Sequence, residues 1–258
     1  MGPAPAPGMA MAEEFVKRVM SDMRLRTFFV LAVAVVGLAA NCAADGIITV
    51  PPSLAPGSQY RLVFVTADFY TATSSNIGDY NTDVNNGANN LAGDTGSLLA
   101  PLGTSWLDIG STATVNAIDN IGIDSGVPIY DLEGNLVAND AGTGVGGMFS
   151  GSLFSSISTT ELGVTTITIT PFTGIFSIGT EAGSVGLGSG LYVDVGLSGA
   201  TSFAWENYET VYGADHEPLY GISEVLTVPT PEPSTTVLLT LGGAILIGAR
   251  RRMVHRIN

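Results

Sequence analysis

Two apolar segments, one near each end of the chain, limit the part that can fold as a globular body to the residues between them. The first segment spans residues 28–40, follows two arginines and is closed by two alanines. A basic stretch, a short apolar run and small side chains that fit a peptidase pocket are together typical of a signal peptide. We therefore predict a leader over residues 1–44, its removal by signal peptidase, and a mature chain that starts at Asp45.

The second apolar segment stands at the other end, behind a proline-rich hinge over residues 229–233. It begins at Ser234 and runs into a cluster of three arginines near the end of the sequence. Such an order is typical of a short membrane helix whose cationic end stays on the inner side of the membrane. We expect residues 234–258 to form an apolar helix with a basic tail, and residues 45–228 to be an exported globular domain.

This tripartite end resembles the PEP-CTERM sorting signal of exported bacterial proteins. The matching residues are Pro231, Glu232, Pro233, Arg250, Arg251 and Arg252. The resemblance implies that an exosortase, a membrane enzyme similar to a transpeptidase, recognises the motif and passes the protein to the cell surface or to the exopolysaccharide matrix. The C-terminal helix would then hold the protein in the membrane, either transiently or permanently.

Positive charge is confined to the two ends. Arg61 is the only Lys or Arg between Thr27 and Ala249, whereas 18 of the 23 Asp and Glu residues lie between residues 46 and 230. Nucleic acid is excluded as a partner, because binding to phosphates needs Lys or Arg. An acidic surface of this kind either is a solvated, salt-adapted surface or holds specific cations. The only cysteine, Cys42, lies in the leader, so the exported domain has no disulfide and no cysteine metal site.

The composition of the middle favours strands and turns, because Gly, Ser, Thr, Asn and Asp are dense there. A helix is expected over residues 77–91, where apolar residues recur near a period of 3.6. The predicted strands cover residues 60–66, 164–170, 172–177, 190–195 and 220–228, with a hairpin over residues 126–138. The expected fold is a single α+β, β-rich domain.

The order of several segments between residues 58 and 228 resembles C-type-lectin-like domains. It includes the strand ending Phe64-Val65-Thr66, the segment 102–109 with Trp106, a glycine-rich middle and the closing residues 219–223. Two short elements are similar to the calcium-binding elements of such domains. From them and their surroundings we select five candidate ligand-binding residues, which are Trp205, Glu206, Asn207, Asp215 and Glu217.

A candidate calcium site comes from alternating oxygen-bearing side chains. Asp79, Asn81 and Asp83 follow one another at every second position, as ligands do in a calcium loop. The alternative is a polar helix face or turn, since the glycine and the glutamate that an EF-hand loop needs are missing. Calcium is the one cofactor that the sequence suggests.

Aromatic side chains provide a second kind of candidate ligand site. Stacking on sugar rings is one role for them, and burial in the core is the other, because each buries a large apolar area. The five aromatic residues that we consider for a sugar-binding platform are Trp106, Trp205, Tyr208, Tyr212 and Tyr220.

The sequence favours a non-enzymatic, exported module that binds extracellular polysaccharide. One alternative is a secreted carbohydrate-active hydrolase that uses Asp215, Glu217 or Glu206, with one carboxyl group as acid and another ionised. The other alternative is a structural matrix or adhesion protein with no small ligand.

Overall fold

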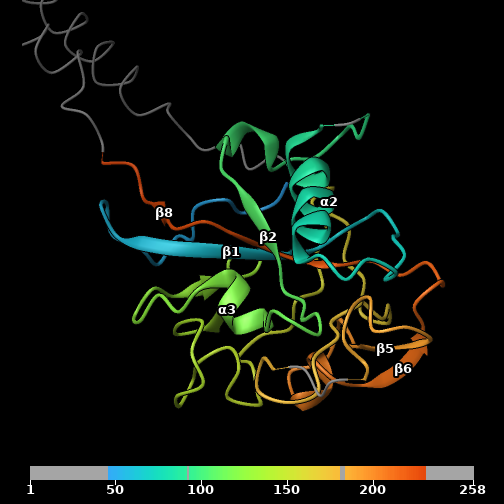
Figure 1. Ribbon diagram of the computed structural model, residues 1–258. Helices are drawn as coiled ribbons and strands as arrows, with labels where there is room; N and C mark the ends of the chain where they lie inside the picture. The colour runs from blue at the N-terminus through green and yellow to red at the C-terminus, as the bar shows by residue number, and fades with distance from the viewer. Residues whose placement is uncertain (1–45, 92, 181–183, 231–258) are drawn as a thin grey trace, which may run out of the picture. The chain divides into compact units, whose positions relative to one another are not determined.

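The computed structural model describes residues 46–91, 93–180 and 184–230, which form an α+β, β-rich body (Figure 1). The predicted leader and the predicted C-terminal helix with its basic tail lie outside these residues. Within the described part of the chain, no helix combines the length and the apolar character that crossing a membrane requires.

A six-stranded mixed sheet forms the centre of the body. Its main path runs in the order β2-β7-β1-β3-β4, and β8 pairs with the first residues of β1. The pair β1 and β3 is parallel, and the other pairs are antiparallel. The strands are β1 (Gln59–Val65), β2 (Trp106–Asp108), β3 (Ile129–Tyr130), β4 (Leu136–Ala138), β7 (Tyr220–Ser223) and β8 (Leu226–Thr227).

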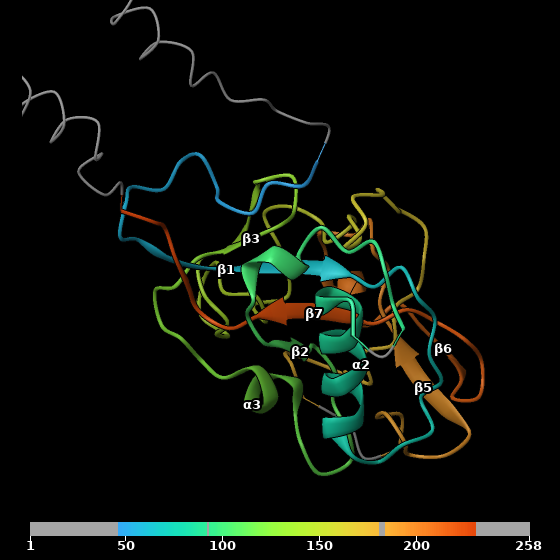
Figure 2. The same ribbon diagram turned by 90° about the horizontal axis from the view of Figure 1, so that it is seen from above.

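Strand β1 is buried on both faces of the sheet, which explains its nearly continuous apolar sequence. Leu62 and Phe64 belong to one core cluster, and Val63 and Val65 belong to the other. Since side chains alternate between the faces of a strand, the sheet separates two cores. In Figures 1 and 2, α2 (Ile77–Asn89) covers one of these faces.

Helix α2 lies close to the sheet because β7 carries a glycine beneath it. A Cβ atom on Gly221 would come within 2.3 Å of the Phe64 ring and 2.7 Å of Val84. Asn76 caps the start of the helix by accepting a hydrogen bond from the Gly78 N–H. The other helical elements are α3 (Ala117–Ile121) and the 3₁₀ turns η1 (Ala100–Leu102) and η2 (Phe203–Trp205).

A separate two-stranded sheet lies apart from the main path. It consists of β5 (Tyr192–Val195) and β6 (Glu209–Tyr212), which pair in an antiparallel register. Phe172 connects it to the main body, because its backbone bridges to Val195 on one side and to Leu219 on the other. This pair of strands is called the β5–β6 ribbon below.

The sequence-based expectations for the local elements are partly confirmed. The helix, the first strand and the hairpin are present, but the strand expected over residues 164–170 is wrong. Only Thr165 forms a bridge there, and the side chains of Val164 and Ile167 are exposed. The alternation of Ile and Thr therefore has no neighbouring strand to pair with. The strand over residues 172–177 is also wrong, since only isolated bridges occur at Phe172 and Ser177.

Arg61 is buried at the centre of the sheet, with 1% of its surface exposed. Its Nε donates to the carbonyl of Ser223 at 2.7 Å, and its Nη1 donates to the carbonyl of Ile121 at 2.9 Å. Nη1 also forms an ion pair with the half-exposed Asp124 at 3.2 Å. The guanidinium group thus joins β1 to the ends of β7 and α3.

We expect Arg61→Met to lower the free energy of unfolding by about 3 kcal/mol or more, because two buried carbonyls lose their donor. Asp124→Asn should cost under about 1 kcal/mol, since that pair is half exposed. Urea unfolding of the purified protein, followed by the fluorescence of the two buried tryptophans, measures both. An Arg61→Met loss no larger than that of Asp124→Asn would contradict the anchoring role.

Candidate functional site

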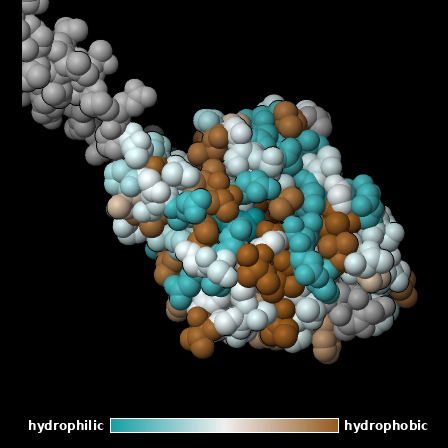
Figure 3. Space-filling model, turned by 60° about the vertical axis from the view of Figure 1, so that its left-hand side comes forward, coloured by the Kyte–Doolittle hydropathy of each residue, from teal (hydrophilic) through white to brown (hydrophobic). Residues whose placement is uncertain are grey.

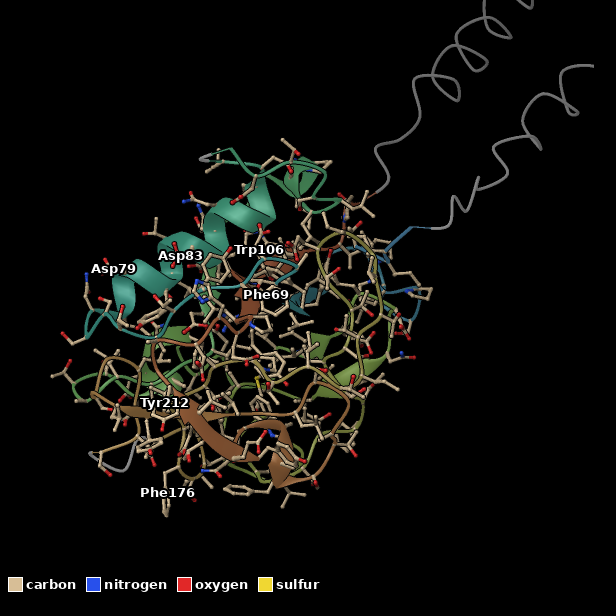
Figure 4. The ribbon with its side chains drawn as sticks, turned by 90° about the vertical axis from the view of Figure 1, so that its right-hand side faces the viewer. Phe69, Asp79, Asp83, Trp106, Phe176 and Tyr212 are labelled. Carbon is tan, nitrogen blue, oxygen red and sulfur yellow. The ribbon has the colours of Figure 1, made fainter. Side chains whose placement is uncertain are left out.

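The candidate calcium residues do not form a site. Asp79, Asn81 and Asp83 lie on α2, where residues two positions apart point about 200° away from each other. Asp79 accepts hydrogen bonds from Ser74 and Asn76 in the loop before the helix. Figure 4 shows Asp79 and Asp83 along the helix. No group of three or more His, Cys, Asp and Glu side chains that could hold a metal ion occurs in the described residues, and the helical placement of Asn81 does not support the calcium prediction at these positions.

The asparagines of α2 cover the open edge of the sheet instead. The Asn81 side chain accepts from the Asp108 N–H at 2.8 Å, and the Asn85 side chain accepts from the Trp106 N–H at 3.2 Å. Asn89 continues the series by donating to the Thr104 carbonyl at 3.0 Å. Four residues of helix advance about 6 Å and two residues of strand about 6.6 Å, so the two spacings match.

This asparagine ladder protects β2, which is an edge strand of the main sheet. Its unpaired backbone groups would otherwise offer a template for another strand. Asn120, which exchanges two hydrogen bonds with the Asn81 amide, completes the cover by donating to the Asp108 carbonyl. The polar face of α2 is therefore structural.

Two of the five candidate ligand-binding residues lie inside the body, and a third is half-buried. Trp205 is 1% exposed and Glu206 is 0% exposed, so neither can meet a ligand at the surface. The Asn207 side chain is half-buried and donates to the Ile175 carbonyl and to the Asp194 carboxylate. Their burial argues against ligand contact by Trp205 and Glu206, and sequence alone does not reveal it because it comes from packing between distant segments.

Glu206 holds a strained turn in place. One of its carboxylate oxygens accepts from the Gly179 N–H at 3.2 Å, next to Ile178, whose φ of 47° is in the left-handed region. Burial raises the pKa of Glu206 to about 7, although hydrogen bonds from the backbone of Gly179 and Ile178 act in the opposite direction. A carboxyl group without access to solvent cannot exchange a proton with a substrate, which removes Glu206 from the hydrolase alternative.

Asp215 and Glu217 lie at the surface, directly after the β5–β6 ribbon. Asp215 is exposed and accepts a hydrogen bond from the Tyr212 N–H at 3.2 Å. Glu217 is half-buried and accepts from the Thr170 hydroxyl at 3.0 Å. Partial burial raises the pKa of Glu217, and the charges of Asp215 and Glu209 add to this rise. Two other carboxylates therefore act on Glu217.

Two exposed tyrosines stack across the ribbon. Tyr192 and Tyr212 are direct partners in the strand register, and their ring centroids are 4.9 Å apart at an interplanar angle of 29°. Their hydroxyl groups lie 3.4 Å apart. The side chains remain 44% and 49% exposed. Each ring packs on the other through one face, which leaves part of the pair open to solvent.

The predicted aromatic platform divides into buried and exposed members. Trp106, Trp205 and Tyr220 are core residues, whereas Tyr208 and Tyr212 are exposed. Figure 4 shows Trp106 and Tyr212 in separate parts of the body. Sequence reasoning missed Tyr192, although the strand expected over residues 190–195 contains it. Only the pairing of β5 with β6 brings Tyr192 beside Tyr212.

The tyrosine pair is therefore the strongest candidate for a ligand contact in the described residues. Other exposed aromatic side chains of the described residues, such as Phe69 and Phe154, do not stack on another ring. On the face seen in Figure 3, apolar side chains gather in several patches among polar ones. The chain matches no protein-family model and no curated protein.

Buried carboxyl groups make the stability of the fold depend on pH. The pKa of Glu206 is about 7 in the folded protein against an ordinary value of 4.5, so the folded state binds the proton more tightly. The free energy of unfolding should therefore fall as the pH rises from about 4.5 to about 7, by up to about 3 kcal/mol from this residue. Burial also raises the pKa of Glu161 to about 7 and that of Asp108 well above its ordinary range.

We expect Glu206→Gln to make the fall between pH 5 and pH 8.5 smaller, whereas Glu224→Gln, at an exposed position, should leave it unchanged. Urea midpoints at both pH values test this. A wild-type protein that becomes more stable as the pH rises over this interval would show that the buried carboxyl groups do not control its stability.

Proposed function

We propose that this protein is exported, is sorted through its C-terminal signal, and binds extracellular polysaccharide without catalysis through the tyrosine pair of the β5–β6 ribbon. The motif Pro231-Glu232-Pro233, the apolar segment behind it and the three arginines support the PEP-CTERM part of the proposal. Signal peptidase and an exosortase are its processing partners. The cell surface or the exopolysaccharide matrix is its destination, with the C-terminal helix as a transient or permanent membrane anchor.

The position of the tyrosine pair supports a role in binding. The described chain ends at Thr230, beside the start of β1, because β8 pairs Thr227 with Gln59 and the Val228 N–H bonds to Ser58. In Figures 1 and 2 this exit and the β5–β6 ribbon lie at opposite ends of the body. A protein held by its C-terminal segment would therefore present the tyrosines away from its anchor.

The chemistry of the pair suits a sugar. A tyrosine ring offers an apolar face to the C–H side of a pyranose, and its hydroxyl group can donate or accept a hydrogen bond. Thr210 lies on the same face of β6 as Tyr212, since residues two apart on a strand share a face. The observation that carries the proposal is this stacked and exposed pair on a ribbon outside the main sheet.

A C-type-lectin-like architecture is the finer fold that we propose for the domain. The mixed sheet with few helices and the pairing of the first strand with the last support it only in outline. We do not propose a calcium site at Asp79, Asn81 and Asp83. The buried position of Glu206 leaves Asp215 and Glu217 as the carboxyl groups of the hydrolase alternative.

Replacing either tyrosine should weaken binding. We expect Tyr212→Ala and Tyr192→Ala each to bind polysaccharide about fivefold more weakly, since an aromatic contact contributes about 1 kcal/mol. Affinity electrophoresis of the full chain, in mild detergent and through gels that contain extracellular polysaccharide, measures the retardation.

Phe69→Ala is the matched control, because Phe69 is 53% exposed but lies outside the ribbon. It should be retarded like the wild type. Equal retardation of all variants would rule out the tyrosine pair, and no retardation of the wild type would favour the structural alternative.

The sorting proposal has its own test. Mass spectrometry of the protein from its native cells should find an N-terminus at Asp45 and a C-terminus near Pro233. Glu232→Ala should leave the C-terminal segment uncut. An intact tail in the wild type would instead indicate a simple membrane anchor and would contradict processing by an exosortase.

A further inference from the structure

The charge of the described surface restricts which polysaccharide the ribbon can take. Arg61 is the only Lys or Arg between residues 46 and 230, and it is 1% exposed. The described surface therefore presents no guanidinium and no lysine ammonium group. A chain of uronates or sulfated sugars would find no such partner there and would be repelled by the surrounding carboxylates.

The immediate surroundings of the tyrosine pair favour positive charge. Asp215 is exposed, and its Oδ2 atom accepts the backbone N–H of Tyr212, which holds this carboxylate at the end of β6 that carries the ring of the proposed sugar contact. Glu209 begins the same strand but, three residues from Tyr212, lies on the other face of the ribbon, so Asp215 is the carboxylate on which the inference rests. The face of a tyrosine ring attracts cations through its quadrupole. The tyrosine ring and the carboxylate thus both attract a positively charged ligand.

We propose that the ligand of the β5–β6 ribbon is an amine-bearing polysaccharide, a polymer of partly N-deacetylated amino sugars. This inference rests on the proposed function. A sugar ring packs against the tyrosine pair, and its ammonium group lies beside the Asp215 carboxylate. The acidic surface raises the local concentration of such a polymer and speeds its approach, and both effects weaken as salt is added.

Three oligosaccharides of equal length test the inference on the full chain in mild detergent at pH 5.5. They are a partly deacetylated glucosamine oligomer, its fully N-acetylated form and an oligogalacturonate. Calorimetry should show at least tenfold tighter binding of the deacetylated oligomer than of the acetylated one, and no binding of the galacturonate. The preference for the deacetylated oligomer should shrink in 0.5 M salt, because the Debye length is then only about 4 Å and the attraction between exposed charges is screened.

Variants separate a site from general attraction between charges. Asp215→Asn keeps an acceptor for the Tyr212 N–H but loses the charge, and it should reduce the preference for the amine at least threefold. Tyr212→Ala should weaken the binding of both glucosamine oligomers. Asp119→Asn makes the same change of charge on α3, which lies away from the ribbon in Figures 1 and 2, and should bind as the wild type does.

The outcomes distinguish this inference from the proposed function. Equal binding of the two glucosamine oligomers, weakened by Tyr212→Ala, overturns the amine preference but supports the polysaccharide site. Binding of the deacetylated oligomer that neither Asp215→Asn nor Tyr212→Ala affects overturns the site and indicates attraction to the whole acidic surface. Tighter binding of the galacturonate overturns the inference. If none of the three oligosaccharides binds, the inference is overturned for these sugars.

Discussion

Arg61 is the interaction on which the rest of the sheet depends. It lies in β1, the strand that pairs with β3, β7 and β8, and its guanidinium group bonds to the carbonyls of Ser223 and Ile121. These carbonyls stand at the ends of β7 and α3, where the regular backbone pairing stops. One planar group with several donors can satisfy them together, which a smaller or apolar side chain cannot do.

This use of Arg61 also determines the character of the surface. Because the only guanidinium of the domain lies inside, nothing cationic remains outside to balance the carboxylates of the described residues, apart from the exposed His216. The fold therefore sets the charge of the surface that the proposed ligand would meet. A domain that places its one cation in the core can recognise neutral or positively charged partners far more readily than anionic ones.

The sequence predicts the elements that depend on neighbouring residues, and it fails where an element or a role depends on contacts with distant segments. The helix from Ile77 and the hairpin around residues 131–135 follow from periodicity and turn residues close by. Of the ladder of Asn81, Asn85 and Asn89, the sequence singles out only Asn81, as part of a candidate calcium loop or a polar face, because the partner strand lies some 20 residues later. The spacing of four between these asparagines is the signal that one helix face carries them.

The same distinction applies to the candidate site. Aromatic composition suggested a platform, but whether a ring is buried depends on packing between distant segments, so Trp205 was misassigned. Tyr192 becomes a candidate only through its register with Tyr212, which the sequence does not reveal.

The β5–β6 ribbon is suited to carry a ligand because it stands outside the main sheet, joined to it through backbone bridges at Phe172. Val193 and Val195 hold its inner side in the core, while Tyr192 and Tyr212 remain exposed. Substitutions on the outer face can therefore change binding without disturbing the sheet that Arg61 organises. The residues that organise the sheet and those of the proposed binding site are therefore different, so an effect of such a substitution on binding could be attributed to the ligand contact itself.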